Sequence, residues 1–379
     1  MKKTFSAFIT MAILQITLAG TANAQQTAIL KTLPNGGYKR ALVGEQIGIT
    51  DVTIHYSRPD VRKREGHIWG EFVPVGYAEQ GFGYSSAAPW RAGENENTTI
   101  EFSTDVRIEG QPLAAGKYGF FIAYDPDECT LIFSRNSTSW GSYYYNPDDD
   151  VLKVKVKPIT AGNSVEWLQY LFTGETRSSA VVTLQWEKLV IPFKIDVDVL
   201  SSQIESFRKE LHGEKGFTWL SWKQAALFCA QNKTNLDEAL QWANNATSVD
   251  FGGSQSFTAW TTKAAVLDSL GRGTEAAEAL KIALPLGSVG DLYNYARNLV
   301  WHKKNKEAFE IAKMNYDKYP DQYLSNTGMA RAYSALGDYK KALAFAQKAD
   351  AQAPDKDNKD WMDKIIKTLL DNKDFNEWT

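Results

Sequence analysis

The chain has few of the residues from which thiol sites and disulfide scaffolds are built. Its 379 residues include only 2 cysteines, Cys129 and Cys229, and these fall in different halves of the chain. Two such distant cysteines make no disulfide framework. Each also stands in an apolar run, which is typical of a small, buried and unreactive side chain.

Histidine is equally scarce, with 4 residues spread at positions 55, 67, 212 and 302. None of these spacings fixes the geometry of a metal site. We therefore expect no metal ion and no other cofactor. The alternative is a site in which His55 and His67 meet Glu94 or Glu96, should their loops converge.

The short motifs of common enzymes are missing as well. The chain contains no G-x-S-x-G, H-E-x-x-H, C-x-x-C or G-x-G-x-x-G sequence. A glycine pair at Gly110 and Gly116-Lys117 is followed by Tyr118 where a phosphate-binding loop needs Ser or Thr. A turn between two strands is the better interpretation of that segment.

No block of basic residues is present either. Lys and Arg number 42 against 45 Asp and Glu, so the formal net charge is -3. Because nucleic-acid binding depends on neutralising phosphate, this balance excludes DNA and RNA as expected partners. Aromatic residues are abundant instead, with 12 tryptophans, which is ample material for a core or for aromatic binding surfaces.

Only the N-terminus has a long apolar run. Lys2 and Lys3 precede a mostly apolar stretch at 5–18, and Ala22-Asn23-Ala24 then offers the small-x-small pattern of a signal-peptidase site. The run is shorter than the roughly 20 residues that cross a bilayer, and no stop-transfer pattern follows. We expect residues 1–24 to be a cleaved signal peptide of a bacterial envelope protein. It would begin at Gln25, reach the periplasm or the cell exterior, and have no membrane span.

From about Glu45 to Leu200 the apolar residues recur with a period of two. Such runs occur at 98–102, 118–124, 152–156 and 191–197, and turn sequences such as Glu109-Gly110-Gln111-Pro112 separate them. Short strands without intervening helices predict an antiparallel β-sandwich or barrel over residues 25–200. Pro192 lies inside the last run and predicts an edge position or a bulge there.

After Leu200 the composition shifts to Ala, Leu, Lys and Gln, and small residues recur at long intervals. The alanine anchors are 37, 32 and 34 residues apart and lie at Ala239, Ala276, Ala308 and Ala342. Two antiparallel helices pack closely where small side chains meet, and a proline after the second helix ends it, as Pro320 and Pro354 would here.

A period near 34 resembles that of tetratricopeptide repeats, over roughly residues 215–360. The pattern predicts an α-helical tetratricopeptide-like solenoid over residues 201–379, with 360–378 as a C-terminal capping helix. An unrelated helical bundle is the alternative. Stacked repeats form an extended concave surface, so a partner protein is expected to bind there.

The segment between Tyr56 and Thr99 departs from strand composition, because Gly, Pro and aromatic residues interrupt the period of two. A second aromatic cluster, Trp140-Gly141-Ser142-Tyr143-Tyr144-Tyr145, follows later. Loops with aromatic and polar groups on a rigid sheet are typical of a ligand site for a small molecule or a glycan. The predicted ligand-binding residues are Arg58, Trp90, Arg91, Asn95, Glu96 and Trp140.

Three interpretations of the chain stay open. The leading one is a non-catalytic exported protein, with a ligand-binding β-domain joined to a protein-binding repeat module. The second is an envelope hydrolase acting on glycan or a similar substrate, with Glu94 or Glu96 as acid or base and Arg91 and His67 nearby. The third is a structural assembly factor, in which Arg91 and Glu96 form an internal pair that locks a long loop.

Several short motifs of the front half also recur in a known family in the same order. They are Tyr56-Ser57-Arg58-Pro59, Trp90-Arg91-x-Gly93-x-Asn95-Glu96-x-Thr98-Thr99, Leu113-x-Ala115-Gly116-x-Tyr118 and Trp140-Gly141. From about Gln46 to Val197 the chain resembles the secreted bacterial family called domain of unknown function 2911. It departs from that family by a longer insert between Gly76 and Trp90 and by Glu94 in place of alanine. The resemblance implies a fold boundary and no assigned activity.

Overall fold

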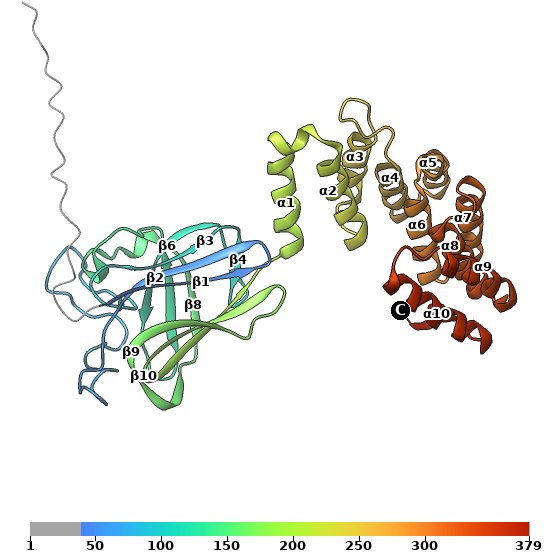
Figure 1. Cartoon of the computed structure of the whole chain (residues 1–379). Coiled ribbons are helices and arrows are strands. Elements are labelled where there is room, and N and C mark those ends of the chain that lie inside the picture. The colour runs from blue at the N-terminus through green and yellow to red at the C-terminus, as the bar shows by residue number, and fades with distance from the viewer. Residues whose placement is uncertain (1–38, 379) are drawn as a thin grey trace, which may run out of the picture.

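The computed structural model describes residues 39–378, so the predicted signal peptide and its cleavage site lie outside the described residues. Over that range, ten β-strands form two antiparallel sheets, and ten α-helices follow them (Figure 1). This order confirms the predicted fold class. The two sheets do not close into a barrel and instead face each other across a shared core, as in a sandwich.

The first sheet has the strand order β1-β2-β3-β6-β7-β8, and the second has the order β5-β4-β10-β9. The strands are β1 Lys39–Ile47, β2 Thr50–Arg58, β3 Thr98–Phe102, β4 Val106–Ile108, β5 Gln111–Leu113, β6 Gly116–Ala123, β7 Cys129–Ser134, β8 Asp150–Val156, β9 Ile159–Thr173 and β10 Ser179–Asp196. Two short 3-10 turns, η1 Gly141–Tyr144 and η2 Pro147–Asp149, lie between β7 and β8.

Alternating residues of the two sheets form one core. In β8, Val154 and Val156 are buried while Lys153 and Lys155 face solvent, as the period of two predicts. Aromatic rings join the sheets across the core, since Phe193 of β10 lies 5.6 Å from Phe120 of β6, measured between ring centroids. The sandwich is therefore held by apolar contacts between the inner faces of both sheets.

Pro192 lies in β10, which is an interior strand of the second sheet and not an edge strand. β10 is registered with β9 as far as Val190 and with β4 from Ile195, so Pro192 falls between the two paired stretches. Register shifts flank Glu187, whose φ of 51° is left-handed. The predicted bulge is therefore present in this strand, a few residues before the proline, and the edge alternative was wrong.

The helical part consists of antiparallel pairs, α2 with α3, α4 with α5, α6 with α7 and α8 with α9. The helices are α1 Val199–Leu211, α2 Trp219–Asn232, α3 Leu236–Ala246, α4 Phe257–Ser269, α5 Gly273–Leu286, α6 Val289–Trp301, α7 Asn305–Lys318, α8 Tyr323–Ala335, α9 Tyr339–Ala351 and α10 Lys356–Leu370. Two short turns, η3 Glu214–Phe217 and η4 Phe375–Trp378, precede α2 and follow α10.

The alanine anchors explain the pairing. All four are buried, and each lies in the second helix of a pair, in α3, α5, α7 or α9. Ala308 and Ala342 are fully buried, as their 34-residue spacing predicts. In Figure 1 the first helices of the pairs line the inner side of an arch and the second helices its outer side. No helix in residues 39–378 has the length and apolar character needed to cross a membrane.

Only Val197 and Asp198 separate β10 from α1. Asp198 caps α1, because its Oδ1 accepts a hydrogen bond of 3.1 Å from the backbone N–H of Ser201. This bond and one from the Ser201 hydroxyl lower the pKa of Asp198. Val199 packs against Gly48 of the β1–β2 turn, where a φ of 64° and the nearby Val199 side chain leave no room for a Cβ. The junction between the two parts is short and packed.

Candidate functional site

Trp90 anchors the long β2–β3 connection to the sandwich. Its backbone pairs with Ile122 of β6 through hydrogen bonds of 3.0 and 2.8 Å. Its ring stacks on Trp186 with 6.1 Å between centroids, and its Nε1 donates to the carbonyl of Gly93 at 3.1 Å. This predicted site residue therefore has its ring and its one donor engaged inside the protein.

Arg91 and Asn95 hold the following turn closed. The Nη1 of Arg91 donates to the backbone oxygen of Asn95 at 2.9 Å, and its guanidinium lies 5.0 Å from the centre of the Tyr143 ring. Asn95 itself has a left-handed φ of 60°. Gly141 is required opposite, because a Cβ there would lie 2.5 Å from the same Nη1.

Glu96 does not pair with Arg91, so the predicted internal pair was wrong. Its carboxylate forms an ion pair with Arg40 of β1 and accepts a hydrogen bond of 2.9 Å from the Ser57 hydroxyl of β2. Arg58 lies at the end of β2, and its Nε donates to the carbonyl of Leu168 in β9 at 2.7 Å. Glu96 thus fastens the loop to β1 and β2, and Arg58 joins the end of β2 to β9, through partners that the sequence did not indicate.

Further bonds complete this fastening. Ala92 O accepts hydrogen bonds from the hydroxyls of Thr98 and Tyr170, at 3.0 and 2.8 Å. Ser142 of η1 donates to the carbonyl of Pro89 at 2.7 Å, which ties the loop to the second aromatic cluster. The loop is thus held by many polar contacts, mostly to main-chain atoms. Of the predicted site residues, Trp140 is the exposed one, with half of its surface open to solvent.

The insert between Gly76 and Trp90 meets the cluster Trp140–Tyr145, and together they form an exposed group of rings. Phe82 lies edge-on to Tyr143, and Tyr84 contacts Tyr144, each at 5.5 Å between centroids. Phe82 and Tyr84 are both 66% exposed. We call the exposed and half-buried rings of these two segments the aromatic surface, and its members are Tyr77, Phe82, Tyr84, Trp140, Tyr143 and Tyr144.

The backbone beneath the aromatic surface is fixed by short contacts. The hydroxyl of Ser85 donates to the carbonyls of Tyr143 and Tyr145, at 3.1 and 2.7 Å. Gly83 has a φ of 77° and lies against the Tyr143 carbonyl, where a Cβ would collide. The sequence showed both aromatic stretches, but their meeting depends on contacts about 60 positions apart, for which no sequence signal exists.

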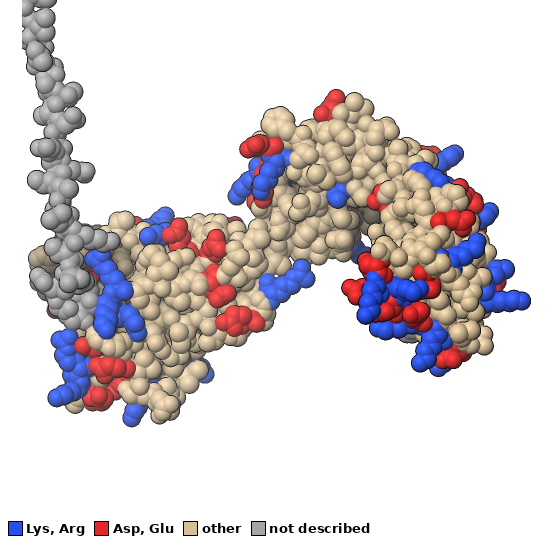
Figure 2. All heavy atoms as spheres, in the orientation of Figure 1, with Lys and Arg blue, Asp and Glu red and all other residues tan. Residues whose placement is uncertain are grey.

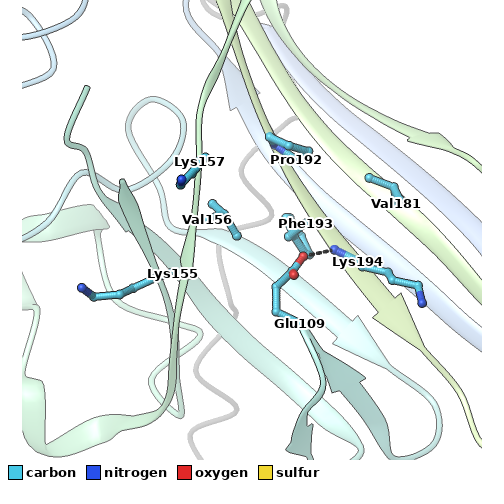
Figure 3. Close-up of a pocket in the computed structure, with 8 residues that line it drawn as sticks. All are labelled: Glu109, Lys155, Val156, Lys157, Val181, Pro192, Phe193 and Lys194. Carbon is cyan, nitrogen blue, oxygen red and sulfur yellow. Dashed lines mark hydrogen bonds between the residues drawn. The ribbon is translucent and has the colours of Figure 1, made fainter. Parts of the chain in front are cut away.

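A hollow lies between the sheets, where β8 approaches β10 (Figure 3). It measures about 270 Å³ and has an apolar floor formed by Val156, Val181, Pro192 and Phe193. Of its three lysines, Lys155 pairs with Glu128 at 2.7 Å and Lys194 with Asp196 at 2.7 Å. Because two of the cations already have carboxylate partners, this hollow is the weaker candidate for a ligand site.

The thiols and histidines stand apart from these surfaces. Burial raises the pKa of the Cys129 thiol, and it raises that of Cys229 to about 11. Both cysteines are buried, as predicted. His55 is exposed on β2, and Nδ1 of His67 lies 3.0 Å from the carboxylate of Glu71. In the part of the chain that the structure describes, no three His, Cys, Asp or Glu side chains converge on one point.

Solved structures similar to this chain are helical repeat proteins, and no curated protein sequence matches it. A Podosopora anserina putative kinesin light chain with TPR-like repeats has 16% identity, covers 40% of this chain and 85% of its own, and gives a TM-score of 0.29. The TPR protein YrrB has 17% identity, covers 45% and 93%, and gives 0.26. MamA from Desulfovibrio magneticus RS-1 has 15% identity, covers 42% and 96%, and gives 0.26.

A family match covers the β-domain. Residues 39–195 match the family described as protein of unknown function (DUF2911), and this range coincides with the two sheets. The β-domain of this chain is therefore similar to the DUF2911 family over residues 39–195, and a series of antiparallel helical pairs follows it.

Proposed function

We propose that this protein is an exported, non-catalytic binding protein with two modules. The aromatic surface of the β-domain binds a carbohydrate chain, and the inner side of the helical solenoid holds a segment of a partner protein. Export follows from the N-terminal sequence pattern, with Gln25 as the first residue of the mature chain.

The observation that carries the carbohydrate half is the group of exposed rings fixed on a rigid base. Large exposed apolar patches on a folded protein mark interaction sites. Tyrosine and tryptophan present an apolar face for the C–H groups of a sugar ring and a polar tip for its hydroxyls. The rings of Tyr84, Tyr143 and Trp140 meet both needs, and the hydrogen bonds beneath them remove much of the ordering cost of binding.

The arrangement of the carboxylates favours binding over hydrolysis. Glu96 is engaged by Arg40 and Ser57, and these partners hold it against the strands as a structural group. Glycoside hydrolysis needs two carboxyl groups that face one substrate at a defined separation. The aromatic surface itself consists of rings and carries no acid among its six members, so it fits recognition of a sugar chain.

The helical half is proposed from the geometry of the pairs. The first helices α2, α4, α6 and α8 line the inside of the arch, and a curved row of helices offers a continuous surface to an extended segment (Figure 1). Figure 2 shows an open space between this inner side and the β-domain.

The test is binding of soluble and insoluble envelope glycans to the full mature chain, by titration calorimetry and co-sedimentation. Tyr84→Ala and Trp140→Ala should each weaken binding roughly fivefold, the equivalent of about 1 kcal/mol for one aromatic contact. Phe217→Ala removes an even more exposed ring from η3, outside the β-domain, and should leave binding unchanged. Equal losses in all three variants, or no glycan bound by the wild type, would contradict the proposal.

A further inference from the structure

The C-terminal segment after α10 lies on the inner side of the last helical pair. The turn η4 contacts α8 and α10, both of which line the inner layer. Phe375 is almost fully buried there and packs in the apolar cluster of these helices. Residues 374–377 of the chain therefore occupy part of the surface on which a partner segment is proposed to bind.

The contacts of this segment are specific to its side chains. The Asn376 amide accepts a hydrogen bond of 2.6 Å from Nη1 of Arg331 and donates one of 3.1 Å to the backbone oxygen of the same residue. Ser334 donates to the Asp374 carboxylate at 2.6 Å. The Arg331 guanidinium also lies 5.1 Å from the centre of the Phe375 ring. Arg331 of the inner helix layer thus contacts the aromatic ring and the amide of this segment, while Ser334 holds its acid.

One repeat earlier, the equivalent arginine is exposed to solvent. Arg297 of α6 lies 34 residues before Arg331, the same interval that separates Ala308 from Ala342 and the buried Ala296 from Ala330. Asn294, Asn298 and Trp301 share its helix face at spacings of three and four residues. Within residues 39–378, the Arg297 guanidinium has no hydrogen bond or ion pair, and the Trp301 ring is 61% exposed.

The match between these two positions indicates what the open face binds. A guanidinium takes an amide or a carboxylate oxygen, and it stacks on an aromatic ring at the same time. At Arg331 the chain supplies both partners from its own C-terminal segment. At Arg297, the helix also carries Trp301 one turn later. An aromatic ring of a bound segment would therefore contact both the Arg297 guanidinium and the Trp301 ring.

We propose that the α6 face formed by Asn294, Arg297, Asn298 and Trp301 binds a segment of a partner protein with the aromatic–amide chemistry of Phe375 and Asn376. This inference rests on the repeat half of the proposed function, and it adds the position of the site and the chemistry of its partner. The C-terminal segment fills the neighbouring position and closes the groove on the α10 side.

The experiment uses the full mature chain and a fluorescent peptide of sequence Asp-Phe-Asn-Glu-Trp, followed by fluorescence anisotropy. Arg297→Glu should weaken binding at least tenfold, and Trp301→Ala severalfold, since both side chains are exposed and their loss leaves the fold intact. Lys313→Glu makes the same charge change on the exposed side of α7 and is the matched control. The peptide Asp-Ala-Asn-Glu-Trp should bind at least tenfold more weakly to the wild type.

Three results would overturn the inference. They are no binding of the peptide to the wild type at millimolar concentration, equal losses for Arg297→Glu and Lys313→Glu, and equal affinity for the alanine peptide. Dimerisation of the intact chain that Arg297→Glu abolishes would also overturn it, because the occupant would then be a second copy. Peptide binding that Arg297→Glu leaves intact would overturn the α6 site while the repeat half of the proposed function still stands. Glycan binding measured on the same samples tests the β-domain separately, since it does not depend on α6.

Discussion

The guanidinium of Arg91 lies 5.0 Å from the centre of the Tyr143 ring, and this contact joins two loops that are 52 positions apart in the sequence. The same guanidinium donates to the Asn95 carbonyl at 2.9 Å. Arg91 is therefore placed below the aromatic surface, as a support for one of its rings.

Replacement of Arg91 with alanine is expected to lower the free energy of unfolding by about 1–3 kcal/mol, because it removes a charge-assisted hydrogen bond and a cation–π contact. Urea unfolding of both proteins measures the difference. Arg62→Ala, which removes an exposed pair with Asp60, should change stability by less than about 1 kcal/mol. If both variants lower the free energy of unfolding by the same small amount, Arg91 does not stabilise the loop.

Ala342 is buried at a helix crossing, so a larger side chain there should overpack the contact. Ala342→Leu is expected to cost about 1–3 kcal/mol of stability and to lower the melting temperature of the helical signal. Ala265 is exposed on α4, and Ala265→Leu serves as the control with no expected loss. An unchanged melt for Ala342→Leu would argue against close packing of α9.

Arg208 of α1 donates three hydrogen bonds to Glu238 of α3, and these bonds lower the pKa of Glu238 below its usual value of 4.5. A carboxyl whose folded pKa is depressed stabilises the fold above its unfolded pKa, and this contribution is lost as the pH falls through the folded pKa. Stability should therefore decrease below about pH 4.5, and less steeply in Glu238→Gln. Glu205→Gln, in a longer and more exposed pair, should keep most of the wild-type slope.

Both thiols should resist modification in the folded protein, because burial raises the pKa of each. A colourimetric thiol titration at pH 8 is expected to detect almost no free thiol without denaturant and two per chain in urea. Rapid reaction of one thiol in the native protein would show that its surroundings open readily.

Export is expected to remove residues 1–24. N-terminal sequencing or intact mass of the protein from an envelope fraction should give a chain that begins at Gln25. Recovery of the chain with Met1 in the membrane pellet would contradict both the cleavage and the exported location.

The sequence predicts the regular elements well and the loop contacts poorly, for a physical reason. Strands and helix pairs leave a periodic record, such as Val154 and Val156 in β8 or the 34-residue interval between Ala308 and Ala342. The bond from Arg58 to the Leu168 carbonyl leaves none, because a main-chain acceptor is present at every residue.

The partner of Glu96 illustrates the same limit. Arg91 is five positions away in the sequence and was the expected partner, but β1 and β2 pair so that Arg40 lies opposite Ser57, and both reach Glu96. Strand register, which depends on the whole sheet, decided this contact. The sequence did not predict the aromatic surface either, because that surface forms only where the insert between Gly76 and Trp90 packs against η1.

The two-residue connection between β10 and α1 has a mechanical consequence. β10 is an interior strand, bonded to β9 along most of its length and to β4 at its end. A force that pulls on a segment bound by the solenoid would reach the β-domain through β10. This force would act along the strand, so the hydrogen bonds between β9 and β10 would bear it in shear and share the load. If the β-domain is bound to a polymer, the protein can connect that polymer to the partner protein and transmit force between them, because no flexible linker between the two domains can stretch.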